Sequence, residues 1–159
     1  MAAAARVLVV DDDALMLATV NQMLSGQGYE VVPASGPRQA LEIVRTTPPI
    51  QLILSDVSMP EMRGTQLVSE VFRLSPQTAG LLMTGDAGSL PDLPEGVTVL
   101  RKPFSTSELL LAVRSTLTQS AELSLQMRAL AERHKRLRSE LLEEVQKSIQ
   151  QLRRSDDSR

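Results

Sequence analysis

The chain has 159 residues, of which 42% are hydrophobic, with two Phe, one Tyr and no Trp, and its formal net charge is −2. This length suits one domain of about 100 to 150 residues with an appendage, and the absence of cysteine excludes disulfides, thiolate metal sites and cysteine nucleophiles. The sequence has no apolar stretch of about 18 residues and its first residues do not resemble a signal peptide, so we expect a soluble, cytoplasmic protein without membrane insertion.

Five short runs rich in apolar residues predict strands, and the first, which ends in three acids, is typical of a parallel strand buried on both faces. They cover residues 6–10, 29–33, 51–55, 79–83 and 97–100. Apolar residues recur at helical spacing over 15–24, 36–47 and 65–74, and again from 109 onward. This alternation indicates right-handed crossovers and a parallel sheet covered on both faces. We therefore expect an α/β, flavodoxin-like, doubly wound sheet of five parallel strands in the order 2-1-3-4-5.

Polar side chains follow four of the predicted strands. Asp11 and Asp12 come after the first strand, Asp56 after the third, Thr84 after the fourth and Lys102 after the fifth. The carboxyl ends of parallel strands share one edge of a sheet, and ligands bind there in open α/β folds. The sequence therefore predicts one pocket that combines carboxylates, a hydroxyl and an ammonium.

The sequence resembles the two-component response-regulator receivers, of the chemotaxis-regulator type. The matching segments are Val-Leu-Val-Val-Asp-Asp-Asp at 7–13, Leu-Ile-Leu-Ser-Asp-Val-Ser-Met-Pro-Glu-Met-Arg-Gly at 52–64, Met-Thr-Gly at 83–85 and Arg-Lys-Pro-Phe at 101–104. The resemblance covers residues 6 to about 118, and we expect a receiver domain over 1–118. It implies a phosphoryl acceptor served by a sensor histidine kinase or a phosphotransfer protein. Such a module is not an enzyme beyond its own phosphoryl transfer and dephosphorylation.

The resemblance also implies roles in phosphoryl transfer. Asp56 would accept the phosphoryl group, and Lys102 would pair first with Asp56 and then with a phosphoryl oxygen. The peptide bond between Lys102 and Pro103 would be cis. The Thr84 hydroxyl would move inward to hydrogen-bond another phosphoryl oxygen, and this movement would be the switch.

The carboxylates of such a pocket need a cation between them, because they would otherwise repel one another and raise each other's pKa. Mg²⁺ suits the pocket, since it prefers oxygen ligands in octahedral geometry. From the resemblance we assign Asp11, Asp12, Asp56 and the backbone carbonyl of Ser58 to the metal site.

Each of these residues also has a structural interpretation. The acids at 11–13 could cap the following helix, and we prefer this role for Asp13. Asp56 could be a turn acid, Thr84 a strand-end cap and Lys102 a surface cation. Gly64 is expected to occupy a backbone position with positive φ.

The segment between the fourth and fifth strands departs from the family. The aromatic residue that commonly lies three positions before the lysine is replaced by Val99. Residues 85–96 contain two prolines and three glycines. The segment between Thr84 and Lys102 is also shorter than is usual in the family. We expect a fourth helix that is short, irregular or missing, so the surface that passes the signal on must differ from that of most receivers.

Residues 119–154 contain no proline or glycine and are rich in helix formers, which predicts one continuous helix, followed by a disordered tail over 155–159. Apolar positions with alternating spacings of four and three are typical of a coiled coil. Nine positions of this helix follow such a pattern, with a shift of the repeat near position 145. They are Leu123, Met127, Leu130, His134, Leu137, Leu141, Val145, Ile149 and Leu152. We expect a coiled-coil extension at 119–154 that forms a parallel homodimer. A different protein bound to this helix, or a linker to an output domain, are the alternatives.

Residues 119–159 carry nine Lys and Arg against seven Asp and Glu. Because the charges alternate at helical spacing, we interpret them as a solvated helix face and expect no nucleic-acid binding. The leading functional hypothesis is a receiver that relays its phosphorylation to an unknown downstream protein through the dimerising helix. The alternatives are a phosphorylation-independent coiled-coil adaptor or scaffold, and the regulatory part of a protein whose output domain is absent. A DNA-binding regulator would need a helix-turn-helix segment, which the sequence lacks.

Overall fold

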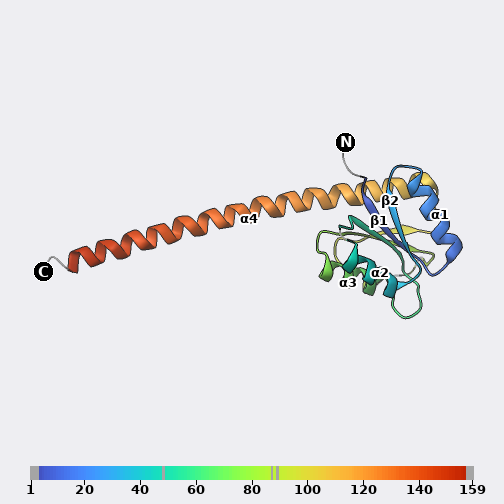
Figure 1. The fold of residues 1–159 in the computed structure, drawn as a ribbon, viewed down its shortest axis with the longest axis horizontal. Helices are drawn as coiled ribbons and strands as arrows, with labels where there is room; N and C mark the ends of the chain where they lie inside the picture. Colours follow the sequence, from blue (N-terminus) through green and yellow to red (C-terminus); the bar gives the residue numbers. More distant parts are fainter. Residues whose placement is uncertain (1–3, 48, 87, 89, 157–159) are drawn as a thin grey trace. The chain divides into compact units, whose positions relative to one another are not determined.

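The computed structural model describes residues 4–47, 49–86, 88 and 90–156. A parallel five-stranded sheet has the order β2-β1-β3-β4-β5, which confirms the predicted order. Figure 1 shows β1 and β2 side by side in this sheet. The strands are β1 (Arg6–Val10), β2 (Glu30–Ala34), β3 (Leu52–Asp56), β4 (Ala79–Thr84) and β5 (Thr98–Arg101). The helices are α1 (Ala14–Ser25), α2 (Pro37–Thr46), α3 (Gly64–Leu74) and α4 (Thr106–Asp156).

Two apolar clusters cover the two faces of the sheet. Side chains from α2 and α3 pack on one face, where Leu8, Ile53 and Leu82 point toward them. Side chains from α1 and the first turns of α4 pack on the other face with Val9 and Leu54. Successive side chains of a strand point to opposite faces of the sheet, and both faces are covered by helices. The side chains on both faces of a central strand must therefore be apolar. This explains the unbroken apolar runs in β1 and β3.

The β4–β5 connection contains no helix among its described residues, as the sequence analysis predicted. Pro91 and Pro94 lack the amide hydrogen that a helix interior requires. Leu90 and Val97 instead pack against the cluster formed with α2 and α3. The connection therefore covers its part of the sheet with an irregular segment.

The expected positive φ at Gly64 is wrong. Among the described glycines, the left-handed region is occupied by Gly28 and Gly96. Gly64 is required for another reason: a Cβ there would clash with the carbonyl oxygen of Asp56 and lie 3.0 Å from the Cα atom of Val57. The first turn of α3 thus packs directly against the backbone at the end of β3.

The helix α4 contributes to both compact units of the chain, which divide between Ser120 and Ala121. In the first unit, its side chains Leu109 and Val113 are fully buried against the sheet. In the second unit, the helix continues to Asp156, two residues beyond its predicted end. The last three residues of the predicted disordered tail, 157–159, lie outside the described residues. No helix in the described part of the chain has the length and hydropathy that a bilayer-spanning segment requires.

Candidate functional site

The three consecutive acids after β1 have different surroundings. Asp11 is only 2% exposed and accepts a hydrogen bond of 2.9 Å from the amide of Asp13. Asp13 caps α1, because its carboxylate accepts hydrogen bonds from the amides of Leu15 and Met16. Asp12 is exposed. The preferred capping role of Asp13 is confirmed, and the other two carboxylates remain available to the pocket.

Asp56 is the last residue of β3 and is 8% exposed. Its Oδ2 atom accepts a hydrogen bond of 3.2 Å from the amide of Ser58. The chain after it is fixed by a hydrogen bond from the amide of Val57 to the carbonyl of Met83 in β4. The carboxylate is therefore held at the edge of the sheet by backbone hydrogen bonds on its C-terminal side.

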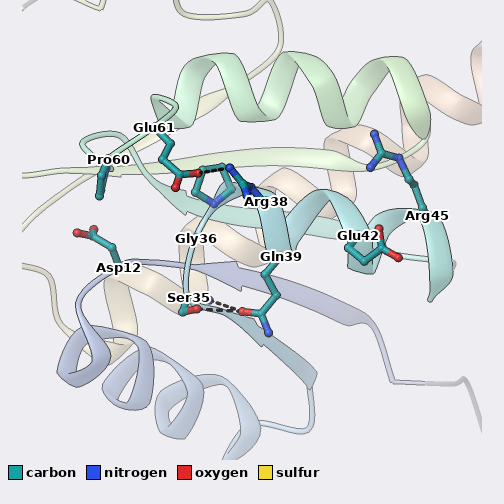
Figure 2. Close-up of a pocket in the computed structure, with 10 residues that line it drawn as sticks. Asp12, Ser35, Gly36, Arg38, Gln39, Glu42, Arg45, Pro60 and Glu61 are labelled. Carbon is teal, nitrogen blue, oxygen red and sulfur yellow. Dashed lines mark hydrogen bonds and ion pairs between the residues drawn. The ribbon is translucent and has the colours of Figure 1, made fainter.

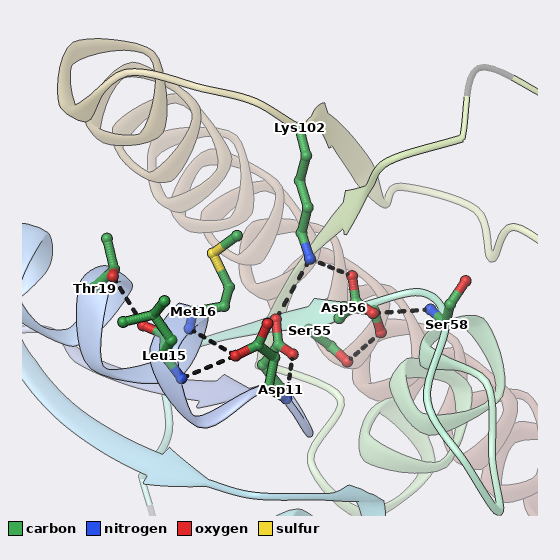
Figure 3. A network of polar contacts seen from close by, with 9 residues as sticks. Asp11, Leu15, Met16, Thr19, Ser55, Asp56, Ser58 and Lys102 are labelled. Atoms are coloured by element: carbon green, nitrogen blue, oxygen red, sulfur yellow. Dashed lines mark hydrogen bonds and ion pairs between the residues drawn. The ribbon is translucent and has the colours of Figure 1, made fainter.

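Lys102 follows β5 and reaches back to the acids. Its amide donates to the carbonyl of Thr84 at 2.8 Å, which continues the sheet pairing by one residue. Its Nζ atom lies 2.7 Å from Oδ1 of Asp56 and 3.5 Å from Oδ2 of Asp11. Figure 3 shows both contacts as dashed lines. The peptide bond to Pro103 is cis, as the resemblance implied. One ammonium thus lies between two carboxylates, one at the end of β3 and one just after β1.

Thr84 ends β4 and is buried. Its hydroxyl accepts a hydrogen bond of 3.1 Å from the amide of Asp86 and lies 3.3 Å from the carbonyl of the same residue. The hydroxyl is therefore engaged with the start of the β4–β5 connection. It also lines a cavity of about 350 Å³ together with Leu90, Leu93 and Val99.

The electrostatics of the pocket follow from burial and from these ion pairs. Burial raises the pKa of Asp11, and the charge of Asp56 adds to this, while the amide of Asp13 and the charge of Lys102 oppose it. Burial alone would lower the pKa of Lys102, but its hydrogen bond and attraction to Asp56, and its attraction to Asp11, together raise it. The ammonium therefore stays charged at neutral pH.

The donor set of the pocket fits a hard divalent cation. Asp11, Asp12 and Asp56 each offer a carboxylate oxygen, and these three atoms lie within 4.8 Å of one another. Oxygen donors of this kind are preferred by Mg²⁺. The single positive charge of Lys102 does not balance the three carboxylates, and a bound divalent cation would supply the missing positive charge. The Ser58 group that contacts Asp56 is the amide, and the role of its carbonyl as a metal ligand stays a prediction.

The family model of the response regulator receiver domain matches residues 7–114. The chain belongs to the response-regulator receiver family. Receiver domains bind Mg²⁺ at an acidic pocket and interact with histidine kinases or phosphotransfer proteins, and they are not enzymes in the ordinary sense.

Two curated relatives are regulators of transcription by name. The chain is 31% identical over 155 residues to the transcriptional regulatory protein PdtaR of Mycobacterium tuberculosis, which covers 92% of this chain and 73% of the relative. It is 34% identical over 122 residues to the transcriptional regulatory protein GlrR of Escherichia coli, which covers 74% of this chain and 27% of the relative. The chain thus spans about a quarter of the length of GlrR.

Solved receiver structures have the same fold. A CheY-like receiver domain protein from Methanospirillum hungatei is 28% identical with a TM-score of 0.67, and the match covers 75% of this chain and 98% of that one. The chemotaxis protein CheY4 of Vibrio cholerae is 32% identical with a TM-score of 0.63, covering 72% and 99%. The matches therefore leave about a quarter of the present chain outside the known domain.

A groove of about 690 Å³ adjoins the pocket of this receiver (Figure 2). Asp12 lies on one side of it, Ser35 and the first turn of α2 on another, and Pro60 and Glu61 on a third. The start of α2 is held by hydrogen bonds from the amide and the hydroxyl of Ser35 to the side chain of Gln39. Solvent therefore reaches the acidic cluster from the side of Asp12.

Sequence reasoning missed a polar contact beside the pocket. The hydroxyl of Thr65, in the first turn of α3, donates a hydrogen bond to the carboxylate of Asp92 in the β4–β5 connection. The guanidinium of Arg63 lies 3.7 Å from the same carboxylate. Because Thr65 and Asp92 are 27 positions apart in the sequence, no local sequence pattern predicts this contact. It ties the irregular connection of the receiver to the helix that packs on Asp56.

Proposed function

We propose that Asp56 accepts a phosphoryl group from the phosphohistidine of a sensor histidine kinase or a phosphotransfer protein, and that the receiver thereby controls a downstream protein. The observation that carries the proposal is the ion pair of 2.7 Å between Lys102 and Asp56 inside the acidic cluster. A carboxylate held in this way is a nucleophile with fixed geometry and a cation beside it. This exchange would take place in the cytoplasm.

In the proposed transfer, an oxygen of Asp56 forms a bond to phosphorus while the bond between phosphorus and the donor's imidazole nitrogen breaks. The imidazole leaves with the electron pair of that bond. Lys102 stays within reach of the oxygens of the transferred group and neutralises part of their charge. Asp11, Asp12, Asp56 and the carbonyl of Ser58 would hold Mg²⁺, which when bound supplies further positive charge against the phosphoryl oxygens.

The proposed switch is the hydroxyl of Thr84. In the structure it is bonded to the backbone of Asp86. A phosphoryl oxygen on Asp56 would offer this hydroxyl a charged acceptor, and hydrogen bonds to charged groups are the stronger ones. Transfer of the hydroxyl to the new acceptor would release the start of the β4–β5 connection. The receiver catalyses no reaction in this proposal except its own phosphorylation and dephosphorylation.

The phosphorylation proposal is tested with Mg²⁺ and acetyl phosphate, followed by intact mass measurement. The wild type is expected to gain the mass of one phosphoryl group, and Asp56→Asn is expected to gain none. Asp13→Asn is the matched control, because Asn also caps helices and the acid lies outside the proposed site; it is expected to behave like the wild type. A wild type that gains no mass would favour the scaffold function instead.

We further propose that residues 119–154 form a homodimer. Large apolar side chains of this part of α4 are exposed by 45% to 70%, including Leu137, Leu141 and Ile149. Exposed apolar stripes of this extent mark interaction sites, and a second copy offers a surface with the same periodicity. Sedimentation at tens of micromolar is expected to give a dimer. A monomer at this concentration would contradict the proposal.

The names of two relatives favour a second candidate function. PdtaR and GlrR are transcriptional regulatory proteins, and the chain spans 27% of GlrR. The present sequence would then be the regulatory part of a longer transcriptional regulator. An immunoblot of source cells with an antibody against the receiver distinguishes a protein of 159 residues from a longer transcriptional regulator. A band well above 17.4 kDa is expected only for the longer protein.

A further inference from the structure

Five of the nine positions of the apolar stripe lie symmetrically about Leu141, whereas the other four, which are Leu123, Met127, His134 and Ile149, have polar or charged counterparts. Counted from Leu141, Leu137 lies four positions before and Val145 four positions after, while Leu130 lies eleven before and Leu152 eleven after. On a helix with 3.6 residues per turn, side chains four positions apart point in directions that differ by about 40°, and side chains eleven positions apart differ by about 20°. These five side chains therefore share one face of α4, in a pattern that is the same from either end.

We propose that two copies of α4 pair antiparallel through this stripe, with the twofold axis at Leu141. The proposal rests on the proposed homodimer and adds its orientation. Leu141 meets Leu141 of the second copy, Leu137 meets Val145, and Leu130 meets Leu152. These side chains are exposed by 47% to 70% in the single chain, so each apolar contact covers surface that is otherwise in water.

Charge disfavours the parallel orientation that the heptads alone suggest. With Leu137 and Leu141 in the seam, Arg133 and Arg138 occupy the flanking positions that face each other across a parallel pair. Residues 128–138 hold five Lys and Arg against one Glu, and a parallel pair would place this segment beside itself. Antiparallel pairing places it beside 144–154, which has three against one, so the repulsion between like charges is smaller than in a parallel pair.

Spin labels measure the orientation directly, because the chain contains no cysteine and one introduced cysteine is a unique site. Ala129→Cys and Ser139→Cys are exposed positions outside the stripe. Antiparallel pairing separates the two Ala129→Cys sites by about 36 Å along the helices and the two Ser139→Cys sites by about 6 Å. Parallel pairing keeps both pairs of labels within roughly 25 Å, since paired helix axes are about 10 Å apart.

The experiment is pulsed electron paramagnetic resonance on the full chain at tens of micromolar. A long distance for Ala129→Cys with a short one for Ser139→Cys is the expected result. Short distances for both variants would overturn the antiparallel orientation and leave the homodimer standing. The absence of any dipolar coupling in both variants, with a monomeric mass by sedimentation, would overturn the homodimer and the orientation together.

Discussion

The ammonium of Lys102 lies 2.7 Å from the carboxylate of Asp56 and 3.5 Å from that of Asp11, so one cation compensates two buried anions. Asp12 brings a third carboxylate within reach of the same point. The pocket is therefore deficient in positive charge as it stands. This deficit determines how the receiver should respond to mutation, to pH and to divalent cations.

Lys102→Gln is expected to destabilise the receiver when divalent cations are absent. The variant leaves the carboxylates of Asp56 and Asp11 without their ammonium, and a hydrogen bond to a charged group contributes about 1.5–3 kcal/mol. Urea denaturation with a chelator measures the loss in the free energy of unfolding. Arg101→Gln removes the neighbouring exposed cation and is expected to change stability by less than about 0.5 kcal/mol. Equal losses in the two variants would show that the ion pair makes no specific contribution.

Asp11→Asn is expected to stabilise the receiver at neutral pH without divalent cations. Burial raises the pKa of Asp11 above 3.8, so the folded state holds this proton more tightly than the unfolded state does. The resulting stability is present below about pH 3.8 and is lost as the pH rises through the raised pKa. At pH 7 the ionised side chain therefore opposes folding, and the neutral amide removes this cost.

Thermal unfolding at pH 7 and at pH 3.5 measures this effect. The midpoint of Asp11→Asn is expected to exceed that of the wild type at pH 7 and to approach it at pH 3.5. Added Mg²⁺ is expected to raise the wild-type midpoint by mass action and to raise that of the variant much less. A variant that is less stable than the wild type at pH 7 would mean that attraction to Lys102 outweighs the cost of burial.

Gly64→Ala is expected to destabilise the receiver by about 1–3 kcal/mol, the usual cost of overpacking. The added Cβ would clash with the carbonyl of Asp56, so either α3 or the end of β3 must move. Chemical denaturation measures the loss. Gly85→Ala is the matched control, since a Cβ there has no neighbour within 4 Å. A neutral Gly64→Ala would show that α3 can shift freely away from the site.

Asp92→Ala is expected to loosen the β4–β5 connection without affecting the sheet. Its carboxylate accepts the hydrogen bond of Thr65, which is the main reason that the pKa of Asp92 is lowered. A lowered pKa means that the contact stabilises the fold above pH 3.8 and that this contribution is lost as the pH falls through the lowered value.

Hydrogen exchange at neutral pH measures the loosening, at the amides of Leu93 and Val97, which are bonded within the connection. Both are expected to exchange faster in Asp92→Ala, whereas Val9 in the centre of the sheet is expected to keep its protection. Glu95→Ala removes another exposed acid of the same segment and is expected to exchange like the wild type. Unchanged exchange in Asp92→Ala would show that other contacts hold the connection.

The sheet could be predicted from the sequence because its order follows from local patterns. Apolar runs such as 6–10 must be buried on both faces, and parallel strands end at one edge. The same reasoning predicted that Asp56 and Lys102 would lie at one edge, where the structure brings them together. The β4–β5 connection without a helix among its described residues followed from its prolines.

Other features could not be predicted because they depend on how loops are routed in space. Gly64 was assigned a backbone conformation, whereas the constraint is the approach of α3 to the carbonyl of Asp56. The contact between Thr65 and Asp92 joins segments that no repeat or spacing connects. Sequence patterns specify which residues are buried and which lie at strand ends, but not which loop lies beside which helix.

The irregular β4–β5 connection would change the thermodynamic form of the proposed signal from Asp56. A helix moves as a rigid cylinder, so a signal carried by it would be a displacement. A segment without repeating backbone hydrogen bonds can open locally, so a signal carried by it would include a change in conformational entropy, which the exchange rates of Leu93 and Val97 would report. Thr84 and Asp92, which anchor the connection to the sheet and to α3, would then limit how much entropy the receiver can release.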